Sequence, residues 1–188
     1  VARRLRDAGY CFRIEMIGSG EMEPRLRQLA SEAGLLETSM QFLGAMSPED
    51  VRRHMEKAGI YLFTSDRQEG WGAVLNEAMN SGCAVVAGDA AGATPFLVQD
   101  GTNGSVYHSG DVQELYEKVR RLLDDPSTQR VFGSAAYRTI TGLWNAETAA
   151  ERFLQLSQAL LDGRDATKLF ADGPCSPASL LREDWYRK

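Results

Sequence analysis

The stretch DRQEGWGAVLNEAM follows directly after the apolar run IYLFTS and contains two glutamates whose spacing suits a binding site. They are Glu69 and Glu77, which lie on either side of the glycine pair Gly70 and Gly72. A carboxylate can accept two hydrogen bonds at once, which suits a vicinal diol such as a ribose. Two plainer roles stay open: Glu69 as a solvated loop residue, and Glu77 as a charge that complements a helix dipole.

The surroundings of these acids favour an anionic ligand. Open parallel sheets bind ligands beyond the carboxyl ends of their strands, where loops lead into helices. Gly70 and Gly72 remove side chains where a ligand could approach the backbone, and a helix that begins near Gly72 offers free N–H groups to a diphosphate. Glu77 lies about two turns into that helix if it starts by Gly70, and just over one turn in if it starts nearer Gly72.

The rest of the chain alternates short apolar runs with helical patterns, which is typical of repeated βα units and a parallel sheet. Met22, Leu26, Leu29 and Ala33 have the spacing of the inner stripe of a helix over 21–34. Further helices are expected over 47–59 and 111–126, and from Ser127 to Leu161 with a break near Gly142 and Asn145. The apolar runs predict five strands, at 12–18, 40–44, 60–65, 84–89 and 104–108.

This order of elements predicts an α/β fold, namely a Rossmann-like, doubly wound parallel sheet followed by helices and a tail. We expect a nucleotide-sugar-binding domain over residues 1–162, with its first strand preceding Val1, and a tail or connecting segment over 163–188. In the tail, Leu180, Leu181 and Trp185 could dock onto another surface.

Composition excludes several classes of protein. The chain carries 21 basic and 26 acidic residues and a net charge of −5, so a nucleic-acid interface is not expected. No apolar run is long enough to span a bilayer, and the first residues lack the apolar stretch of a signal peptide. We therefore expect a cytoplasmic protein. Its three cysteines are far apart and fit neither a disulfide framework nor a zinc site.

Other candidate sites are weaker. The GSG that contains Gly18 and Gly20 follows a strand, but Glu23 stands where a dinucleotide fingerprint needs its third glycine. His54 and His108 have no nucleophile near them in sequence, and we interpret them as structural or surface residues. Asp124 and Asp125 are interpreted as solvated residues at a helix end.

The stretch EGWGAVLNEAM resembles the E-G-F-G-x-x-x-x-E-A-M motif of the retaining glycosyltransferases of family 4, which have the two-domain GT-B fold. IGSGEMEPRLRQLA is similar to that family's glycine loop, QFLGAMSPEDV to its next strand and helix cap, and AGATPFLVQDGTNGSVY to the segment after the acidic motif. The resemblance covers about residues 1 to 160, and it implies that this chain is the carboxyl-terminal, donor-binding half of a GT-B enzyme.

The resemblance also implies roles for individual residues. Glu69 would face the donor sugar and support its transfer, which makes it the catalytic residue, and Glu77 would hold the ribose hydroxyls. Gly18 and Gly20 would let a loop approach the nucleotide, and the backbone near Ala45 and Met46 would border the base. The sugar and diphosphate would meet backbone N–H groups of Gly70, Trp71, Gly72, Ala73 and Val74.

Three departures from the family pattern stand out. Phe96 replaces a glutamate of the G-G-x-P-E stretch, Ala93 replaces its second glycine, and Trp71 replaces a phenylalanine. In addition, the Arg and Lys that grip the diphosphate in that family belong to a strand and loop that would precede Val1.

The resulting hypothesis is a hexosyl-type glycosyltransferase of polysaccharide biosynthesis that uses a UDP- or GDP-linked sugar, needs no metal or other cofactor, and retains the anomeric configuration. Its partner would be the amino-terminal acceptor domain of the same enzyme, without which this part would be inactive. Peripheral contact with the inner face of a membrane fits this class. Two alternatives stay open: a non-catalytic nucleotide-binding module, and a structural domain that docks through residues 127–188.

Overall fold

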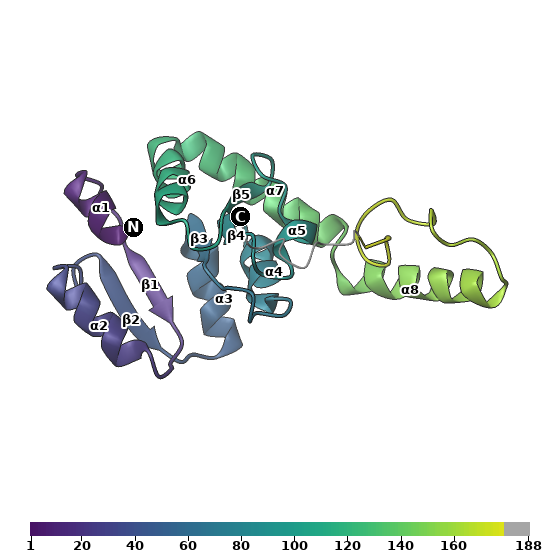
Figure 1. The fold of residues 1–188 in the computed structure, drawn as a ribbon, viewed down its shortest axis with the longest axis horizontal. Helices are drawn as coiled ribbons and strands as arrows, with labels where there is room; N and C mark the ends of the chain where they lie inside the picture. The colour runs from purple at the N-terminus through teal and green to yellow at the C-terminus, as the bar shows by residue number, and fades with distance from the viewer. Residues whose placement is uncertain (179–188) are drawn as a thin grey trace.

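The computed structural model describes residues 1–178, which form eight helices and five strands (Figure 1). The strands are β1 (Ile14–Ile17), β2 (Met40–Gly44), β3 (Ile60–Phe63), β4 (Ala84–Gly88) and β5 (Gly104–Tyr107). The helices are α1 (Ala2–Asp7), α2 (Glu23–Glu32), α3 (Pro48–Lys57), α4 (Ala73–Asn80), α5 (Thr94–Leu97), α6 (Val112–Asp124), α7 (Pro126–Gly142) and α8 (Ala146–Leu161).

All five predicted strands form, and every pairing between them is parallel. They are divided between two sheets, however: β1 pairs with β2, while β3, β4 and β5 form the second sheet in that order. β4 lies in the middle of the larger sheet, and all its residues are buried. This explains its continuous apolar sequence, since a strand covered on both faces needs no alternation.

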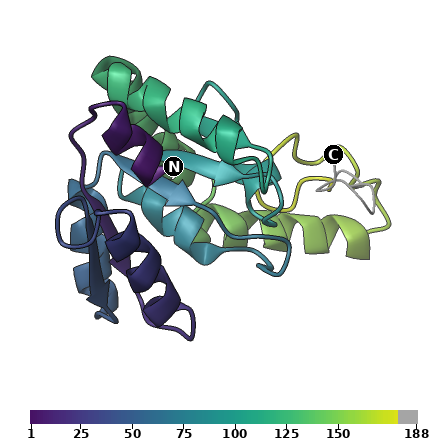
Figure 2. The same cartoon turned by 60° about the vertical axis from the view of Figure 1, so that its left-hand side comes forward.

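Helices cover both faces of the three-stranded sheet, as Figure 2 shows, which confirms the Rossmann-like α/β class. One face packs against α3, α4, α5 and the carboxyl-terminal part of α7, through residues such as Met55, Leu75 and Ile140. The other face packs against α1, α6 and Phe132 of α7. Strand residues alternate between the two cores, and α7 contributes to both of them.

The predicted helix starts follow from side-chain caps. Ser47 Oγ accepts a hydrogen bond from Asp50 N at 3.2 Å, and Asp111 Oδ1 accepts one from Glu114 N at 2.9 Å. A side-chain oxygen in this position satisfies a backbone donor that has no partner within the helix. The helical stretch after Ser127 breaks where predicted: α7 ends at Gly142, and Asn145 caps α8.

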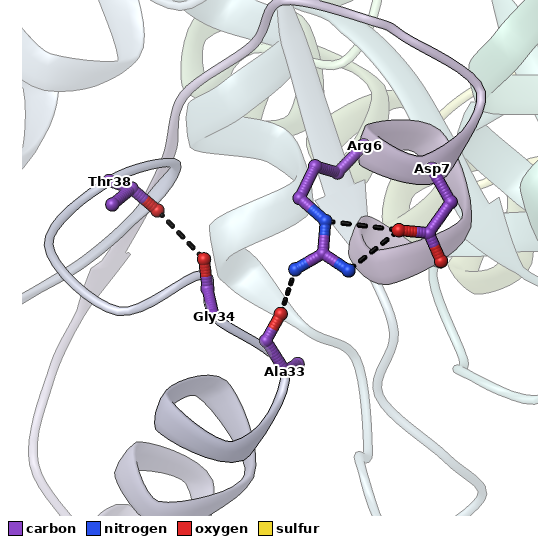
Figure 3. Close-up of polar contacts among 5 residues, drawn as sticks. All are labelled: Arg6, Asp7, Ala33, Gly34 and Thr38. Carbon is purple, nitrogen blue, oxygen red and sulfur yellow. Dashed lines mark hydrogen bonds and ion pairs between the residues drawn. The ribbon is translucent and has the colours of Figure 1, made fainter.

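The first two helices are tied together by one arginine (Figure 3). Arg6 on α1 donates to Ala33 O at the carboxyl end of α2, and its guanidinium also pairs with Asp7 at 2.6 Å. A cation suits a helix carboxyl end because unpaired carbonyls gather there.

The predicted inner stripe of α2 is wrong in part: Met22 is 63% exposed and Leu29 is 43% exposed, while Ala30 is the buried residue. No other described element covers Met22 and Leu29 enough to bury them, so this part of the stripe stays in contact with solvent.

At the other end of the chain, α8 extends away from the sheets, and the segment after it returns along the helix (Figure 1). Arg152 on α8 lies over the Phe170 ring, with 4.7 Å between its guanidinium carbon and the ring centroid, and it also donates to Pro174 O at 3.4 Å. Leu180, Leu181 and Trp185 lie outside the described residues. Among residues 1–178, none of the helices combines the length and apolar character that crossing a membrane would require.

Gly133 lets α7 pack closely against the loop before β4, and this gives a stability prediction. A Cβ at Gly133 would lie 2.2 Å from the backbone oxygen of Gly82, whereas one at Gly142, in the same helix, would meet nothing within 4 Å. We expect Gly133→Ala to lower the free energy of unfolding by about 1–2 kcal/mol, despite the better helix propensity of alanine. Gly142→Ala should be neutral or stabilising by up to about 1 kcal/mol. Urea denaturation of both variants tests this, and equal effects at the two positions would contradict it.

Candidate functional site

The loop between β3 and α4 holds the predicted acidic motif. It ends at Gly72, which has φ +84° and ψ +62° and immediately precedes the first helical residue, Ala73. A Cβ at Gly72 would lie 2.4 Å from Cζ of Phe63. Gly72 is therefore required both by its left-handed backbone and by the ring that fills the space beside it. This corrects part of the sequence interpretation, because the space at Gly72 is taken by Phe63 rather than left for a ligand.

The segment that contains Gly92 and Ala93 packs against this loop. Ala93 N donates to Trp71 O at 2.9 Å, and a Cβ at Gly92 would lie 1.9 Å from Gly70 O. Gly92 thus allows a backbone-to-backbone approach that no other residue would permit. Gly70 itself is exposed, and a Cβ there would meet nothing within 4 Å. Of the two motif glycines, Gly70 is the one whose surroundings are open to a ligand.

The amino end of α4 has the properties of an anion site. Gly72 has no side chain that could cap the helix, and Ala73 and Val74 in the first turn are exposed. The first N–H groups of a helix have no partner within it, and the helix dipole adds a partial positive charge at this end. A diphosphate placed here would meet the free backbone N–H groups of the first turn.

The two carboxylates differ in burial. Glu69 is half-buried and Glu77 is exposed. Because α4 begins at Ala73, Glu77 lies just over one turn into the helix. Burial first, and then the negative charges of Glu77, Cys83 and Glu69, raise the pKa of Tyr61 above its ordinary value of 10.

Glu77 also borders a cleft of about 530 Å³ between α4 and the junction of α7 with α8. Six of its eight lining residues have polar side chains, most of them amides and carboxylates, and the other two are an indole and an isoleucine. It is lined by Asn76, Glu77, Asn80, Ile140, Thr141, Trp144, Asn145 and Glu147. Such a lining can exchange hydrogen bonds with a ligand rich in hydroxyl groups.

The remaining predicted residues belong to the other sheet. Gly18 follows β1 with φ +127°, and its N–H donates to Gly44 O at 2.8 Å. Gly20 is exposed near it, while Ala45 and Met46 follow β2. The structure thus gathers the residues from Glu69 to Glu77 around α4, and it leaves Gly18, Gly20, Ala45 and Met46 at the carboxyl ends of the two-stranded sheet.

Both histidines pair with carboxylates. His54 Nδ1 lies 2.6 Å from Glu15 Oε2, which connects α3 to β1. His108 Nδ1 lies 2.8 Å from Asp89 Oδ2, and its Nε2 is buried and has no hydrogen-bond partner among the described residues. Neither histidine adjoins the loop after β3 in sequence. Among residues 1–178, no group of three His, Cys, Asp or Glu side chains could hold a metal ion.

The two aspartates at the end of α6 are structural. Asp124 accepts a hydrogen bond from the Tyr10 hydroxyl at 2.6 Å. Asp125 caps α7 by accepting hydrogen bonds from the side chains and backbone N–H groups of Ser127 and Thr128, and these bonds lower its pKa below the ordinary value of 3.8.

Sequence reasoning missed an aromatic cluster beside the site, made of Trp71, Phe96 and Trp144. Phe96 was noted only as a departure from the family pattern, and Trp144 was not singled out. These rings come from three separate segments, and no local pattern in the sequence indicates that they meet.

Cys83 lies at the start of the strand after α4, and its Sγ donates to Met55 O at 3.1 Å. Burial raises the pKa of its thiol to about 11. Since the thiolate is the reactive form, we expect the folded protein at pH 8 to react with a thiol reagent at the exposed Cys11 and not at Cys83. Peptide mapping of labelled protein, before and after unfolding in urea, tests this. Equal labelling of both cysteines in the folded state would contradict it.

Parallel strands covered by helices on both faces define a Rossmann-like domain, in which an uncapped helix end lies between two glutamates in the sequence. The family described as glycosyl transferases group 1 matches residues 1–139. This chain therefore belongs to the group 1 glycosyl transferases.

Two characterised relatives are similar over most of this chain. The GDP-mannose-dependent monoacylated alpha-(1-6)-phosphatidylinositol monomannoside mannosyltransferase of Corynebacterium glutamicum is 31% identical, over 77% of this chain and 38% of that protein. Sulfoquinovosyl transferase SQD2 of Arabidopsis thaliana is 30% identical, over 79% of this chain and 28% of that protein. The chain thus spans well under half the length of these relatives.

Solved structures show the same architecture. Anabaena HepE in complex with UDP matches with a TM-score of 0.69 and 26% identity, over 80% of this chain and 41% of that one. TarM matches with a TM-score of 0.72, over 82% of this chain and 30% of that one, and at 22% identity this likeness concerns the fold alone.

Proposed function

We propose that this chain is the donor-binding, carboxyl-terminal part of a retaining family 4 glycosyltransferase with the GT-B fold, which transfers a hexosyl-type sugar from a nucleoside diphosphate to a hydroxyl acceptor. The observation that carries the proposal is the uncapped amino end of α4, which follows Gly72 directly and lies between Glu69 and Glu77. Because this chain belongs to the group 1 glycosyl transferases, we assign this helix end to the diphosphate of the sugar donor.

In the proposed reaction, the diphosphate lies against the backbone N–H groups from Gly70 to Val74. Negative charge grows on the diphosphate as the bond to the sugar breaks, and fixed donors stabilise that charge most strongly in the transition state. Glu69 holds the donor sugar so that the acceptor hydroxyl can approach, and Glu77 accepts hydrogen bonds from the ribose. Gly18, Gly20, Ala45 and Met46 border the base. The proposed chemistry assigns no step to a metal or another cofactor.

The unpaired sheet edges support the proposal that further chain completes the fold. Within residues 1–178, β1 pairs only with β2, and β3 pairs only with β4. In a doubly wound sheet of order 3-2-1-4-5-6, removing strand 1 leaves the pairs 3-2 and 4-5-6, which is the pattern seen here. We propose that a parallel strand preceding α1 joins β1 to β3, and that its loop brings the cations for the diphosphate. An amino-terminal domain would supply the acceptor surface, so residues 1–188 alone should not catalyse transfer.

Two nucleoside diphosphates are candidates for the donor, UDP and GDP. HepE is described in complex with UDP, and the Corynebacterium relative is GDP-mannose-dependent. We propose a UDP- or GDP-linked sugar as donor and an acceptor in glycan or glycolipid synthesis, with the enzyme acting in the cytoplasm or on the inner face of a membrane.

Titration of the isotope-labelled chain with UDP, GDP and their sugars, followed by amide chemical shifts, tests the proposal. We expect shifts centred on residues 70–77, with dissociation constants in the high-micromolar range because one side of the site is open. Silence with every nucleotide would overturn the proposal in favour of a structural docking domain. Binding in the separately prepared full-length enzyme without sugar transfer would favour a non-catalytic nucleotide-binding module.

A further inference from the structure

Three aromatic rings meet beside the proposed donor loop. The ring centroids lie 5.8 Å apart for Trp71 and Phe96, 5.7 Å for Trp71 and Trp144, and 6.5 Å for Phe96 and Trp144. All three separations fall in the range where tilted aromatic pairs attract each other. Trp71 comes from the loop before α4, Phe96 from α5 and Trp144 from the junction of α7 and α8. The cluster therefore connects the loop to two elements that are distant in sequence.

Trp71 is an exposed loop residue, yet several separate contacts fix its position. Its side chain is 40% exposed, and that of Phe96 is 39% exposed, so burial alone does not fix either ring. Trp71 Nε1 donates to Asn76 Oδ1 on α4 at 2.8 Å. Its carbonyl oxygen accepts from Ala93 N at 2.9 Å. Ring contacts, the indole N–H and the backbone carbonyl together restrict both the side chain and the main chain of this residue.

Glu69 lies between this anchor and a second one. On its amino-terminal side, Asp66 Oδ1 accepts from Gln68 N at 2.9 Å, and Asp66 O accepts from Glu69 N at 3.0 Å. These bonds make a local turn that depends on Asp66 and on no residue distant in sequence. On the carboxyl-terminal side, the chain passes through Gly70 to the ring-held Trp71. Gly70 has no side chain, and its carbonyl oxygen packs against Gly92, so order after Glu69 depends on the Gly92–Ala93 backbone together with Trp71.

We infer that Phe96 and Trp144 are positioning residues: they hold Trp71, and through it the Glu69–Gly72 loop, in the conformation that receives the donor. Phe96 stands where the family pattern has a glutamate. In this chain the position acts through ring packing rather than through charge. The inference rests on the proposed function for its meaning, but the ordering of the loop can be measured without any ligand.

The test compares Phe96→Ala with Phe96→Tyr, which keeps the ring, and with Phe153→Ala, which removes a ring on α8 that is 61% exposed, against 39% for Phe96. The first readout is hydrogen exchange at two hydrogen-bonded amides of the loop and its support, Glu69 N–H, which donates to Asp66 O, and Ala93 N–H, which donates to Trp71 O. We expect exchange about tenfold faster in Phe96→Ala, because two ring contacts are lost, and exchange within about twofold of wild type in the other two variants. Core amides of α4 should be unchanged in all of them. Near-UV circular dichroism should report a weaker Trp71–Trp144 signal in Phe96→Ala alone.

The second readout is the affinity for UDP- and GDP-sugars. The apparent affinity falls in proportion to the fraction of time that the loop spends in the conformation that binds the donor. We therefore expect about tenfold weaker binding in Phe96→Ala and wild-type affinity in Phe96→Tyr. Unchanged loop exchange in Phe96→Ala overturns the inference, as does acceleration spread evenly over α4 and the loop, which would indicate general destabilisation. If the wild type binds no nucleotide, the proposed function fails, and the exchange comparison still decides whether the rings order the loop.

Discussion

Replacing Glu77 with glutamine is expected to weaken nucleotide-sugar binding by about tenfold, and replacing it with alanine by up to a few hundredfold. The carboxylate can accept two hydrogen bonds from a ribose diol, and each charge-assisted bond contributes about 1.5–3 kcal/mol. Glutamine keeps the size of the side chain and one acceptor oxygen, so it should lose only part of this energy. Glu77 is exposed, and neither change should unfold the protein. Calorimetric titration with UDP, GDP and their sugars measures the effect.

Glu147 provides a matched control, since it lines the same cleft from the opposite wall. Glu147→Gln should leave nucleotide binding unchanged if the ribose lies against Glu77. A loss of affinity in Glu147→Gln, with none in Glu77→Gln, would place the ligand on the α8 side of the cleft and contradict the assignment. Glu69→Gln adds a second comparison: it should weaken binding of the sugar nucleotide while leaving binding of the free nucleotide unchanged, because Glu69 is assigned to the sugar.

The second large effect is expected at Gly72. Gly72→Ala combines a left-handed backbone, at φ +84°, with a Cβ only 2.4 Å from the Phe63 ring. The backbone strain costs about 1–2 kcal/mol, and overpacking costs about 1–3 kcal/mol more. We therefore expect a loss of about 2–5 kcal/mol in the free energy of unfolding, measured by urea denaturation. Nucleotide binding should fall in parallel, because the residue sets where α4 begins.

Gly82, just beyond the other end of α4, separates the two causes. It has φ +78°, but a Cβ there would meet nothing within 4 Å. Gly82→Ala should therefore lose only the backbone term of about 1–2 kcal/mol. Adding Phe63→Leu to Gly72→Ala should restore part of the lost stability, because the smaller side chain relieves the contact that the new Cβ creates. The effects of the two substitutions should therefore not be additive. Equal losses at Gly72 and Gly82, or no coupling with Phe63, would show that steric contact with the ring is unimportant.

The sequence alone predicted the local features of this protein well. The five parallel strands, the caps at Ser47 and Asp111 and the helix break near Asn145 all appear in the structure. These features depend on hydrophobic periodicity and on hydrogen bonds between residues three or four positions apart, which can be read within a short window of sequence. The resemblance to a known family was confirmed at the level of the group 1 glycosyl transferases.

Features that depend on distant contacts were decided only by the tertiary structure. The path of the chain brings Trp71, Phe96 and Trp144 together, places Phe63 against Gly72, and divides the strands between two sheets. It also exposes Met22, whose spacing predicted burial, because no second layer covers that side of α2. The physical reason is the same in each case: periodicity shows which face of an element is apolar, whereas the partner of that face depends on how all the elements pack.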